Sequence, residues 1–218
     1  MSLGADASTT AEGEARRALG KPLPRDFYDR PVTRVARDLI GRMLVHDTRE
    51  GRVAGVIVEV EAYRGEADPA SHAFRGRTRR NAVMFGEPGH AYVYFTYGMH
   101  HCLNLVTGRD GVASAVLLRA AEPRIGIEIM RRRRGVPVLE RLARGPGCLA
   151  QAFGLDLTRN GLDVTQPPLW VSDRRPERLA GRIGTSSRVG IRVATERPWR
   201  FFVRESPFVS GPRGGLRR

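Results

Sequence analysis

The sequence predicts a single α+β domain built on a largely antiparallel sheet, and three observations support this fold class. Segments with strand patterns cluster in the middle of the 218-residue chain. Short turns join them, as in β-hairpins, and helical patterns lie before and after the cluster. No internal repeat occurs, and a chain of this length can bury a sizeable core. We expect one folded domain over 21–212, a disordered tail at 1–20 and a basic tail at 213–218.

The composition is strongly basic, with 37 Lys+Arg against 23 Asp+Glu and a formal net charge of +14. Such an excess favours a polyanionic partner, and nucleic acid before a membrane surface. The alternative is an arginine-rich but merely solvated surface, because Lys21 is the only lysine. Cys102 and Cys148 form no CxxC motif, and no apolar run is long enough to span a bilayer. We therefore expect a cytoplasmic protein that does not bind membranes.

Three helices are predicted outside the strand cluster. The first covers 32–40, where apolar residues recur at helical spacing after Pro31 and before Gly41. The second begins at 122–123 and ends in four arginines, 131–134. These cations suit either the negative end of the helix dipole or a phosphate backbone, and the sequence favours neither. The third helix is short, 148–153, and stops at Gly154.

Strands are expected where apolar and β-branched residues alternate with polar ones. The predicted strands are 43–47, 53–63, 91–97, 101–107, 112–119, 169–172, 189–193 and 201–203. Turns at 48–51 and 97–100 make hairpins of the first two pairs. The segment 65–89 is polar, with possible helix starts at Asp68 and Thr78.

The segment 56–63 (VIVEVEAY) carries the first candidate chemistry. Alternation along a strand places Val56, Val58, Val60 and Ala62 on one face and Ile57, Glu59, Glu61 and Tyr63 on the other. The glutamates then form either a solvated edge or a carboxylate beside an aromatic ring in a cleft. An apolar wall would raise a glutamate pKa and suit it to general-base catalysis. A Mg²⁺ nuclease site made of Glu59, Glu61 and Asp68 is a further alternative.

The hairpin 91–101 is the second candidate. Tyr92, Tyr94 and Thr96 share one face of its first strand, and Val93, Phe95 and Tyr97 share the other. The turn leaves Tyr97 and Met99 exposed. On a basic protein, exposed apolar tips suit insertion into a DNA base step. The alternative is a core hairpin whose aromatic rings all pack inward.

Other kinds of catalytic site lack their motifs. His100 and His101 are adjacent, so in a strand they point in opposite directions and cannot chelate one ion together. The sequence contains no HExxH motif, no GxSxG nucleophile elbow and no phosphate-binding P-loop. We expect neither a metal nor another cofactor.

Five segments together resemble the single-domain alkyladenine (3-methylpurine) DNA glycosylases. They are 58–63 (VEVEAY), 92–99 (YVYFTYGM), 116–123 (VLLRAAEP), 145–149 (GPGCL) and 206–210 (SPFVS). The resemblance runs from about residue 23 to 210. It implies a curved sheet with surrounding helices and a protruding β-hairpin, and it implies a monomer.

The resemblance also implies roles for individual residues. Glu61 matches the general base that activates a water molecule, and Arg119 matches an arginine that helps to hold this water. Tyr63, His72 and Tyr94 match the walls of a base pocket, and Asn104 matches a residue that crowds the exocyclic amine of normal guanine. Tyr97 matches the wedge that fills the gap left by a flipped nucleotide, with Met99 beside it. His100 departs from the family, since some relatives have an aromatic residue there.

The activity implied is that of a monofunctional DNA glycosylase of base excision repair. Such an enzyme flips an alkylated or deaminated purine out of duplex DNA and hydrolyses its N-glycosidic bond. The partner is then double-stranded DNA that contains damaged purines. A non-catalytic basic module that binds nucleic acid is the alternative from another class.

Overall fold

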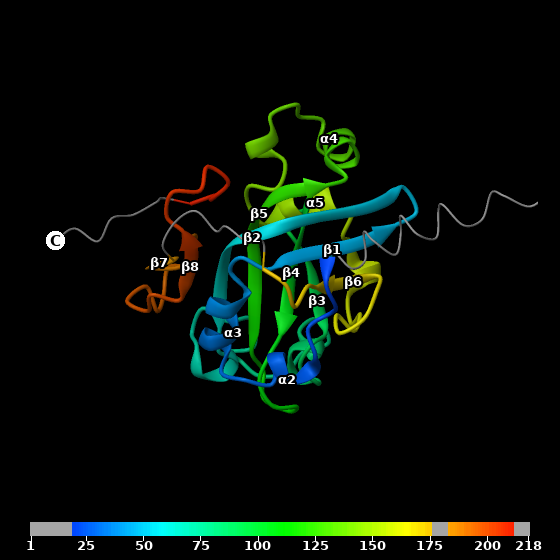
Figure 1. Ribbon diagram of the computed structural model, residues 1–218. Helices are drawn as coiled ribbons and strands as arrows, with labels where there is room; N and C mark the ends of the chain where they lie inside the picture. The colour runs from blue at the N-terminus through cyan, green and yellow to red at the C-terminus, as the bar shows by residue number, and fades with distance from the viewer. Residues whose placement is uncertain (1–18, 176–182, 212–218) are drawn as a thin grey trace, which may run out of the picture.

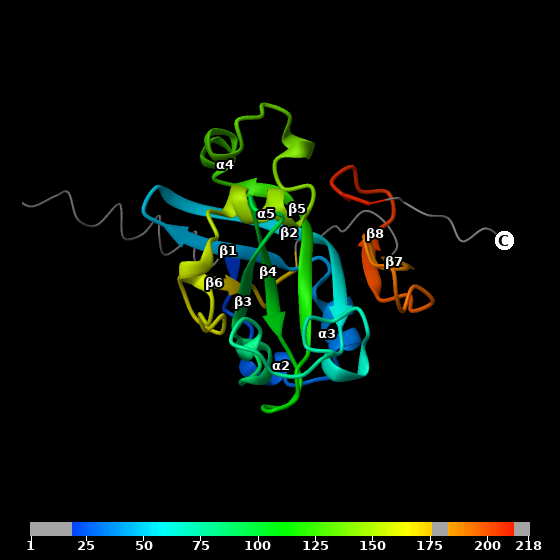
Figure 2. The same ribbon diagram turned by 180° about the vertical axis from the view of Figure 1, so that it is seen from behind.

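The computed structural model describes residues 19–175 and 183–211, which form one curved antiparallel sheet with helices around it (Figures 1 and 2). The strand order is β3-β4-β5-β2-β1-β6, and β8 pairs with both β2 and β7 beside this path. The strands are β1 (Met43–Thr48), β2 (Gly51–Tyr63), β3 (Ala91–Thr96), β4 (His100–Val106), β5 (Ala115–Ile125), β6 (Leu169–Val171), β7 (Ile183–Ser186) and β8 (Arg200–Val203). The predicted α+β class is confirmed.

The α-helices lie toward opposite ends of the sheet (Figure 1). They are α2 (Arg25–Tyr28), α3 (Val32–Leu39), α4 (Ile127–Arg134) and α5 (Pro146–Phe153). Helix α3 turns Val32, Val35, Ala36 and Leu39 into the main core, as their helical spacing predicts. Short 3₁₀ helices cover η1 (Gly65–Ala67), η2 (Ala82–Phe85), η3 (Leu139–Arg141) and η4 (Leu157–Arg159). The helix starts that we considered at Asp68 and Thr78 are therefore not followed by α-helices.

The long strand β2 changes partners along one edge. Its first half pairs with β1 as far as Val56, and residues 59–61 pair with β8 instead. Its other edge pairs with β5 from Ala54 to Tyr63, and one of the register shifts in this pairing falls between Ile57 and Glu59. Val58, Val60 and Ala62 face the main core, as alternation predicts. Ile57 also belongs to this core rather than to the face of the glutamates, because the irregular pairing at this point breaks the strict alternation.

Two predicted elements are wrong. Residues 122–123 do not begin a helix, because β5 continues through Pro123 to Ile125 and α4 begins only after Gly126. Gly126 has a φ of 70°, and this left-handed residue turns the chain from strand to helix. The segment 189–193 is not a strand but an irregular loop, and the strand nearest to it is β7.

The arginine run at the end of α4 is bound by protein groups. Arg131 contacts Glu128, Arg133 contacts Glu50 and the carbonyl of Ala152, and Arg134 donates to the carbonyl of Leu142. Arg133 and Arg134 thus fasten α4 to neighbouring segments, whereas Arg131 pairs with Glu128 inside the helix. This favours the structural explanation of the run over contact with phosphates.

The predicted tails fall mostly outside the described residues, which exclude 1–18 and 212–218. Leu19, which we assigned to the N-terminal tail, is buried and packs with Val45, Ala54 and Trp170. Across the described residues, no helix is both long and apolar enough to cross a membrane.

We predict that the free energy of unfolding falls as the pH drops from about 7.5 to 5.5. His46 is fully buried on β1, and its Nδ1–H donates to the carbonyl of Phe153 at 2.8 Å. Burial lowers the pKa of His46, although this hydrogen bond partly offsets the effect. In the unfolded chain, the pKa of this histidine is about 6.5. Below that pH the unfolded chain therefore binds a proton at His46 more readily than the native protein does, and this favours unfolding.

Urea titrations at the two pH values measure this slope. His46→Asn keeps a donor for Phe153 but cannot titrate, so the pH dependence should shrink in that variant. It should not vanish, because the pKa of His72 is also lowered. An unchanged slope in His46→Asn would contradict the assignment.

Candidate active site

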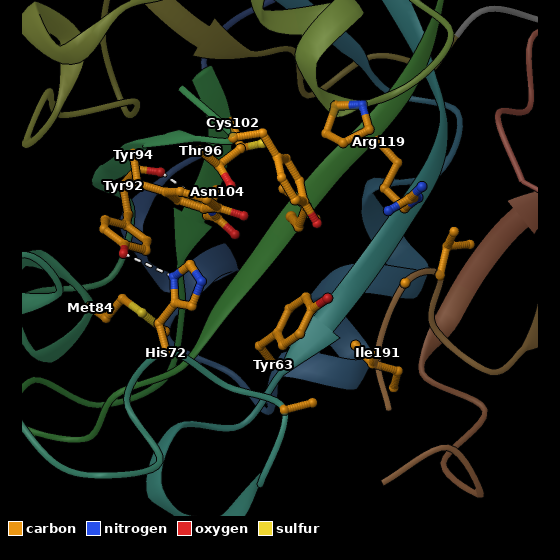
Figure 3. A pocket seen from close by; sticks show the side chains of 16 residues that line it. Tyr63, His72, Met84, Tyr92, Tyr94, Thr96, Cys102, Asn104, Arg119 and Ile191 are labelled. Carbon is orange, nitrogen blue, oxygen red and sulfur yellow. Dashed lines mark hydrogen bonds between the residues drawn. The ribbon is translucent and has the colours of Figure 1, made fainter. Parts of the chain in front are cut away.

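A cavity of about 240 Å³ opens where β2, β3, β4 and β5 come together (Figure 3). Pockets for drug-sized ligands measure about 300–1,000 Å³, so this one suits a smaller, flat molecule such as a single base. Its wall includes all four predicted pocket residues, together with Arg119 and Tyr97. These four are Tyr63, His72, Tyr94 and Asn104.

Aromatic rings make opposite walls of the cavity. Tyr63 stands on one side with Ile191 nearby, and His72, Tyr92 and Tyr94 stand on the other (Figure 3). The rings of His72 and Tyr94 meet edge to face, with centroids 4.6 Å apart. The His72 Nδ1 and the Tyr92 hydroxyl share a hydrogen bond of 3.1 Å. A planar ring can therefore enter between two aromatic surfaces.

The aromatic groups of the wall are electrically neutral near pH 7. Desolvation by the surrounding side chains, and then the charge of Arg80, lower the pKa of His72. Burial raises the pKa of Tyr63 and of Tyr94, so both hydroxyls keep their protons. A neutral, electron-rich wall attracts a cationic aromatic ring instead of repelling it.

Asn104 is fixed in the buried part of this wall. Its side-chain Nδ2 donates to the carbonyl of Tyr92 at 3.1 Å, across the β3–β4 pair in which these two residues are partners. The hydrogen bond gives the amide one orientation at the surface of the cavity. A fixed polar group in a tight wall discriminates between rings by their exocyclic substituents.

Glu61 lies directly behind the cavity wall rather than on its surface. Its carboxylate is fully buried and accepts hydrogen bonds from the Tyr63 hydroxyl at 2.8 Å and the Val189 N–H at 2.6 Å. The Arg119 Nη1 lies 3.3 Å from the Glu61 Oε1. All three of these partners line the cavity. The solvated edge considered for the glutamates is therefore wrong, because β8 covers β2 at this point.

Arg119 bridges the two glutamates of β2. Its Nε donates to the Glu59 Oε1 at 2.9 Å, while its Nη1 points toward Glu61. Arg200 on β8 donates to the same Glu59 oxygen at 2.7 Å, and the Ser210 N–H donates to Glu59 Oε2 at 2.6 Å. Burial would raise the pKa of Glu59, but Arg119 and Arg200 outweigh it and lower this pKa. Glu59 is therefore ionised at neutral pH.

A buried ion pair holds the loop that covers Glu61. Arg188 donates to both carboxylate oxygens of Asp68, at 2.5 and 2.8 Å, and neither side chain is exposed. Its guanidinium carbon lies 4.6 Å from the ring centroid of Tyr63. The Arg188 side chain thus backs the Tyr63 wall, and its main chain leads into Val189. Burial alone would raise the pKa of Asp68, but the hydrogen bonds from Arg188 outweigh this effect, so the pKa is lowered overall.

The hairpin tip is exposed and strained. Tyr97 and Met99 are 87% and 70% exposed, as predicted. Tyr97 and Gly98 have φ angles of 51° and 69°, and a tight hairpin turn of this kind prefers asparagine or glycine in such positions. A tyrosine held in this conformation at a cost of about 1 kcal/mol favours a role for its ring outside the protein core. Met99 lies beside the neighbouring hollow rather than the cavity.

His100, the departure from the family pattern, packs at the beginning of α5. A Cβ on Gly147 would lie 2.9 Å from the His100 ring, so the glycine makes room for it. The sequence did not point to Arg188, Arg200 or the loop 189–191 as parts of the site. No motif marks them, because 188–191 form an irregular loop and Arg200 begins the short strand β8.

The comparisons agree with this geometry. The family model described as "Methylpurine-DNA glycosylase (MPG)" matches residues 26–207. The chain belongs to the methylpurine-DNA glycosylase family. A Rhodopseudomonas palustris HaA2 protein is 49% identical over 205 residues, which are 94% of this chain and 98% of that protein. A Methanocella arvoryzae protein is 51% identical over 86% of this chain and 95% of its own length. Both carry the name "Putative 3-methyladenine DNA glycosylase".

Membership of the methylpurine-DNA glycosylase family confirms the resemblance drawn from the five sequence segments. The matched region contains every residue of the cavity wall, from Tyr63 to Ile191. Glu59, Glu61 and Arg119 also lie within it. The site described above is therefore part of the family domain and not an addition to it.

We predict that Asp68→Asn destabilises the protein by about 3–5 kcal/mol, because it leaves the buried guanidinium of Arg188 without a counter-charge. Urea unfolding monitored by tryptophan fluorescence measures the loss. Asp110→Asn, at an exposed aspartate, is the matched control and should unfold like wild type. Equal stability of the two variants would show that the pair contributes nothing.

Proposed function

We propose that the protein is a monofunctional DNA glycosylase that releases alkylated or deaminated purines from double-stranded DNA. As a member of the methylpurine-DNA glycosylase family, it is a hydrolase of N-glycosidic bonds that acts in the repair of alkylated purines. The observation that carries the proposal is a base-sized cavity with aromatic walls, backed by the buried carboxylate of Glu61. We propose a cytoplasmic monomer that acts on chromosomal DNA.

Recognition begins with extrusion of the damaged base. Flipping the nucleotide out of the duplex costs a few kcal/mol, because its stacking and base pairing are lost. The exposed ring of Tyr97 supports a wedge role, since base–aromatic stacking contributes about 1–3 kcal/mol. The base then lies between Tyr63 and the rings of His72 and Tyr94. Alkylated purines that carry a positive charge gain about 0.5–2 kcal/mol from cation–π attraction to such rings.

Asn104 is proposed to select among purines. Its amide is fixed by Tyr92, so it cannot turn away from an exocyclic amine that approaches it. Normal guanine would then meet a steric and hydrogen-bonding mismatch that costs binding free energy in the flipped state.

Hydrolysis is assigned to Glu61 and Arg119. Glu61 orients and deprotonates a water molecule aimed at C1′ of the sugar, and the Arg119 Nη1 helps to hold that water. The carboxylate is fully covered in this structure by Tyr63, Arg119 and the Val189 N–H. Water therefore reaches Glu61 only when the Tyr63 hydroxyl or the loop 188–191 shifts, and a bound nucleotide is the natural trigger.

The lysine content supports the monofunctional mechanism. A lyase forms a Schiff base between an amine and the sugar. Lys21 is the only lysine, and its segment pairs with Ser172 beyond β6, at the edge of the sheet opposite β3. No lysine lines the cavity.

The two alternative functions have weaker support. The carboxylates of the hypothetical Mg²⁺ nuclease are committed to guanidinium groups, Glu59 to Arg119 and Arg200 and Asp68 to Arg188. A non-catalytic basic module needs neither a cavity nor a buried carboxylate behind it. A basic binding module therefore leaves both features unexplained, whereas a glycosylase uses both.

We predict that Glu61→Gln lowers the single-turnover rate of base release by at least about 100-fold, because it removes the general base. Binding to a duplex with a stable abasic-site analogue should be largely retained. The assay separates released bases from methylated duplex DNA by chromatography. Glu128→Gln, at an exposed glutamate of α4, is the control and should match wild type.

The same assay tests the other parts of the proposal. Wild type should release 7-methylguanine and 3-methyladenine in the presence of EDTA, and the DNA strand should break only after alkali. Borohydride trapping of a covalent adduct would refute the monofunctional mechanism. Full activity of Glu61→Gln would remove Glu61 from the chemistry.

We predict that Tyr97→Asn weakens binding to the abasic-analogue duplex by about 10-fold, which corresponds to the loss of about 1.4 kcal/mol of stacking. Asparagine accepts the left-handed backbone of the turn, so the fold should be unchanged. Val138→Ser, at another exposed apolar residue, is the control. Fluorescence anisotropy at fixed salt gives the affinities, and an unchanged affinity would refute the wedge.

A further inference from the structure

We propose that Glu59 is a positioning residue that holds Arg119 in place and keeps it from neutralising Glu61. The proposal rests on the glycosylase function argued above and deepens it. Glu59 does not touch the cavity, and its effect on the reaction passes through Arg119.

The geometry divides Arg119 between two carboxylates. Its Nε lies 2.9 Å from Glu59 Oε1, a good hydrogen bond, whereas its Nη1 lies 3.3 Å from Glu61 Oε1. Glu59 and Glu61 are two residues apart on β2 and therefore lie on the same face of the strand. A guanidinium that lay between them without restraint could turn its planar fork onto either carboxylate.

The surroundings of Glu59 make it the stronger anchor. Oε1 of Glu59 also accepts from the Arg200 Nε at 2.7 Å, and Oε2 accepts from the Ser210 N–H at 2.6 Å. Glu59 is fully buried, and these partners fix its rotamer from β5, β8 and the C-terminal segment at once. The Arg119 Nη2 contacts the Ser210 Oγ at 3.3 Å as well. These contacts hold the guanidinium through Nε and Nη2, while Nη1 stays within ion-pair distance of Glu61.

The charge count leads to the same role. The cluster contains two carboxylates, Glu59 and Glu61, and two guanidinium groups, Arg119 and Arg200. With Glu59 ionised, Arg119 faces a second carboxylate besides Glu61, although it shares the Glu59 Oε1 with Arg200. Without that charge, Glu61 is the nearest carboxylate to Arg119, and a close bidentate pair would take up the lone pairs that a catalytic water must use.

Three variants and a double mutant test the proposal. Glu59→Gln keeps the size of the side chain but removes its charge, and we expect single-turnover excision of 7-methylguanine about 100-fold slower than wild type. Glu59→Asp keeps the charge at a shorter reach, and we expect a smaller loss of about 10-fold. Affinity for the abasic-analogue duplex should stay at the wild-type level in both.

The rank order separates positioning from packing. If Glu59 merely filled space, Glu59→Gln would be the better isostere and the more active variant, whereas the proposal requires Glu59→Asp to be more active. Because Glu59 acts through Arg119, the double variant Glu59→Gln/Arg119→Ala should be no slower than Arg119→Ala alone. Glu122→Gln, on β5 but remote from the cluster, should match wild type.

Each outcome has a definite meaning. Inactive wild-type protein would refute the proposed function and this role with it. Active wild type with an equally active Glu59→Gln, with the reverse rank order, or with additive losses in the double variant would refute only the role of Glu59. If loss of the buried charge unfolds Glu59→Gln, the Glu59→Asp variant decides alone, since a wild-type rate in it overturns the proposal.

Discussion

The site depends on one guanidinium shared by two buried carboxylates of the same strand. Arg119 lies between Glu59 and Glu61, within hydrogen-bond reach of the first and slightly farther from the second. Moving such ions out of water is costly unless every charge is balanced and bonded. Arg200 and the Ser210 N–H complete the balance, so these five groups have to be assembled together. That requirement constrains β2, β5, β8 and the C-terminal segment simultaneously.

The change of partners along β2 makes this assembly possible. Where β1 ends its pairing, β8 takes its place and brings Arg200 next to the glutamates. The edge of β2 beside Glu59 and Glu61, which the β1–β2 hairpin leaves unpaired, is therefore covered by β8. On the other side, Tyr63 and the loop 188–191 separate Glu61 from the cavity. A carboxylate in such a place has well-defined partners, which fix its orientation for the role of general base that we propose for Glu61.

The sequence could predict what short-range patterns encode. Alternation along 58–63 placed Glu59, Glu61 and Tyr63 on one face of the strand. The turn between the two strands of the aromatic hairpin predicted that Tyr97 and Met99 are exposed. It could not predict that β5 continues through Pro123, because a proline after a glutamate is also a helix start. Nor could it find Arg188 and Arg200, since long-range ion pairs leave no periodic trace. The five segments of family resemblance supplied the proposed roles that patterns alone left open.

The origin of the cavity wall has a consequence for biosynthesis. One side of the wall comes from β2 to β5, whereas Val189, Ser210 and Arg200, which cover and bind the two glutamates, come from the last part of the described chain. The two glutamates therefore lack these partners until the segment 189–210 has been synthesised and has folded onto β2. The buried charge balance is then among the last parts of the domain to be completed.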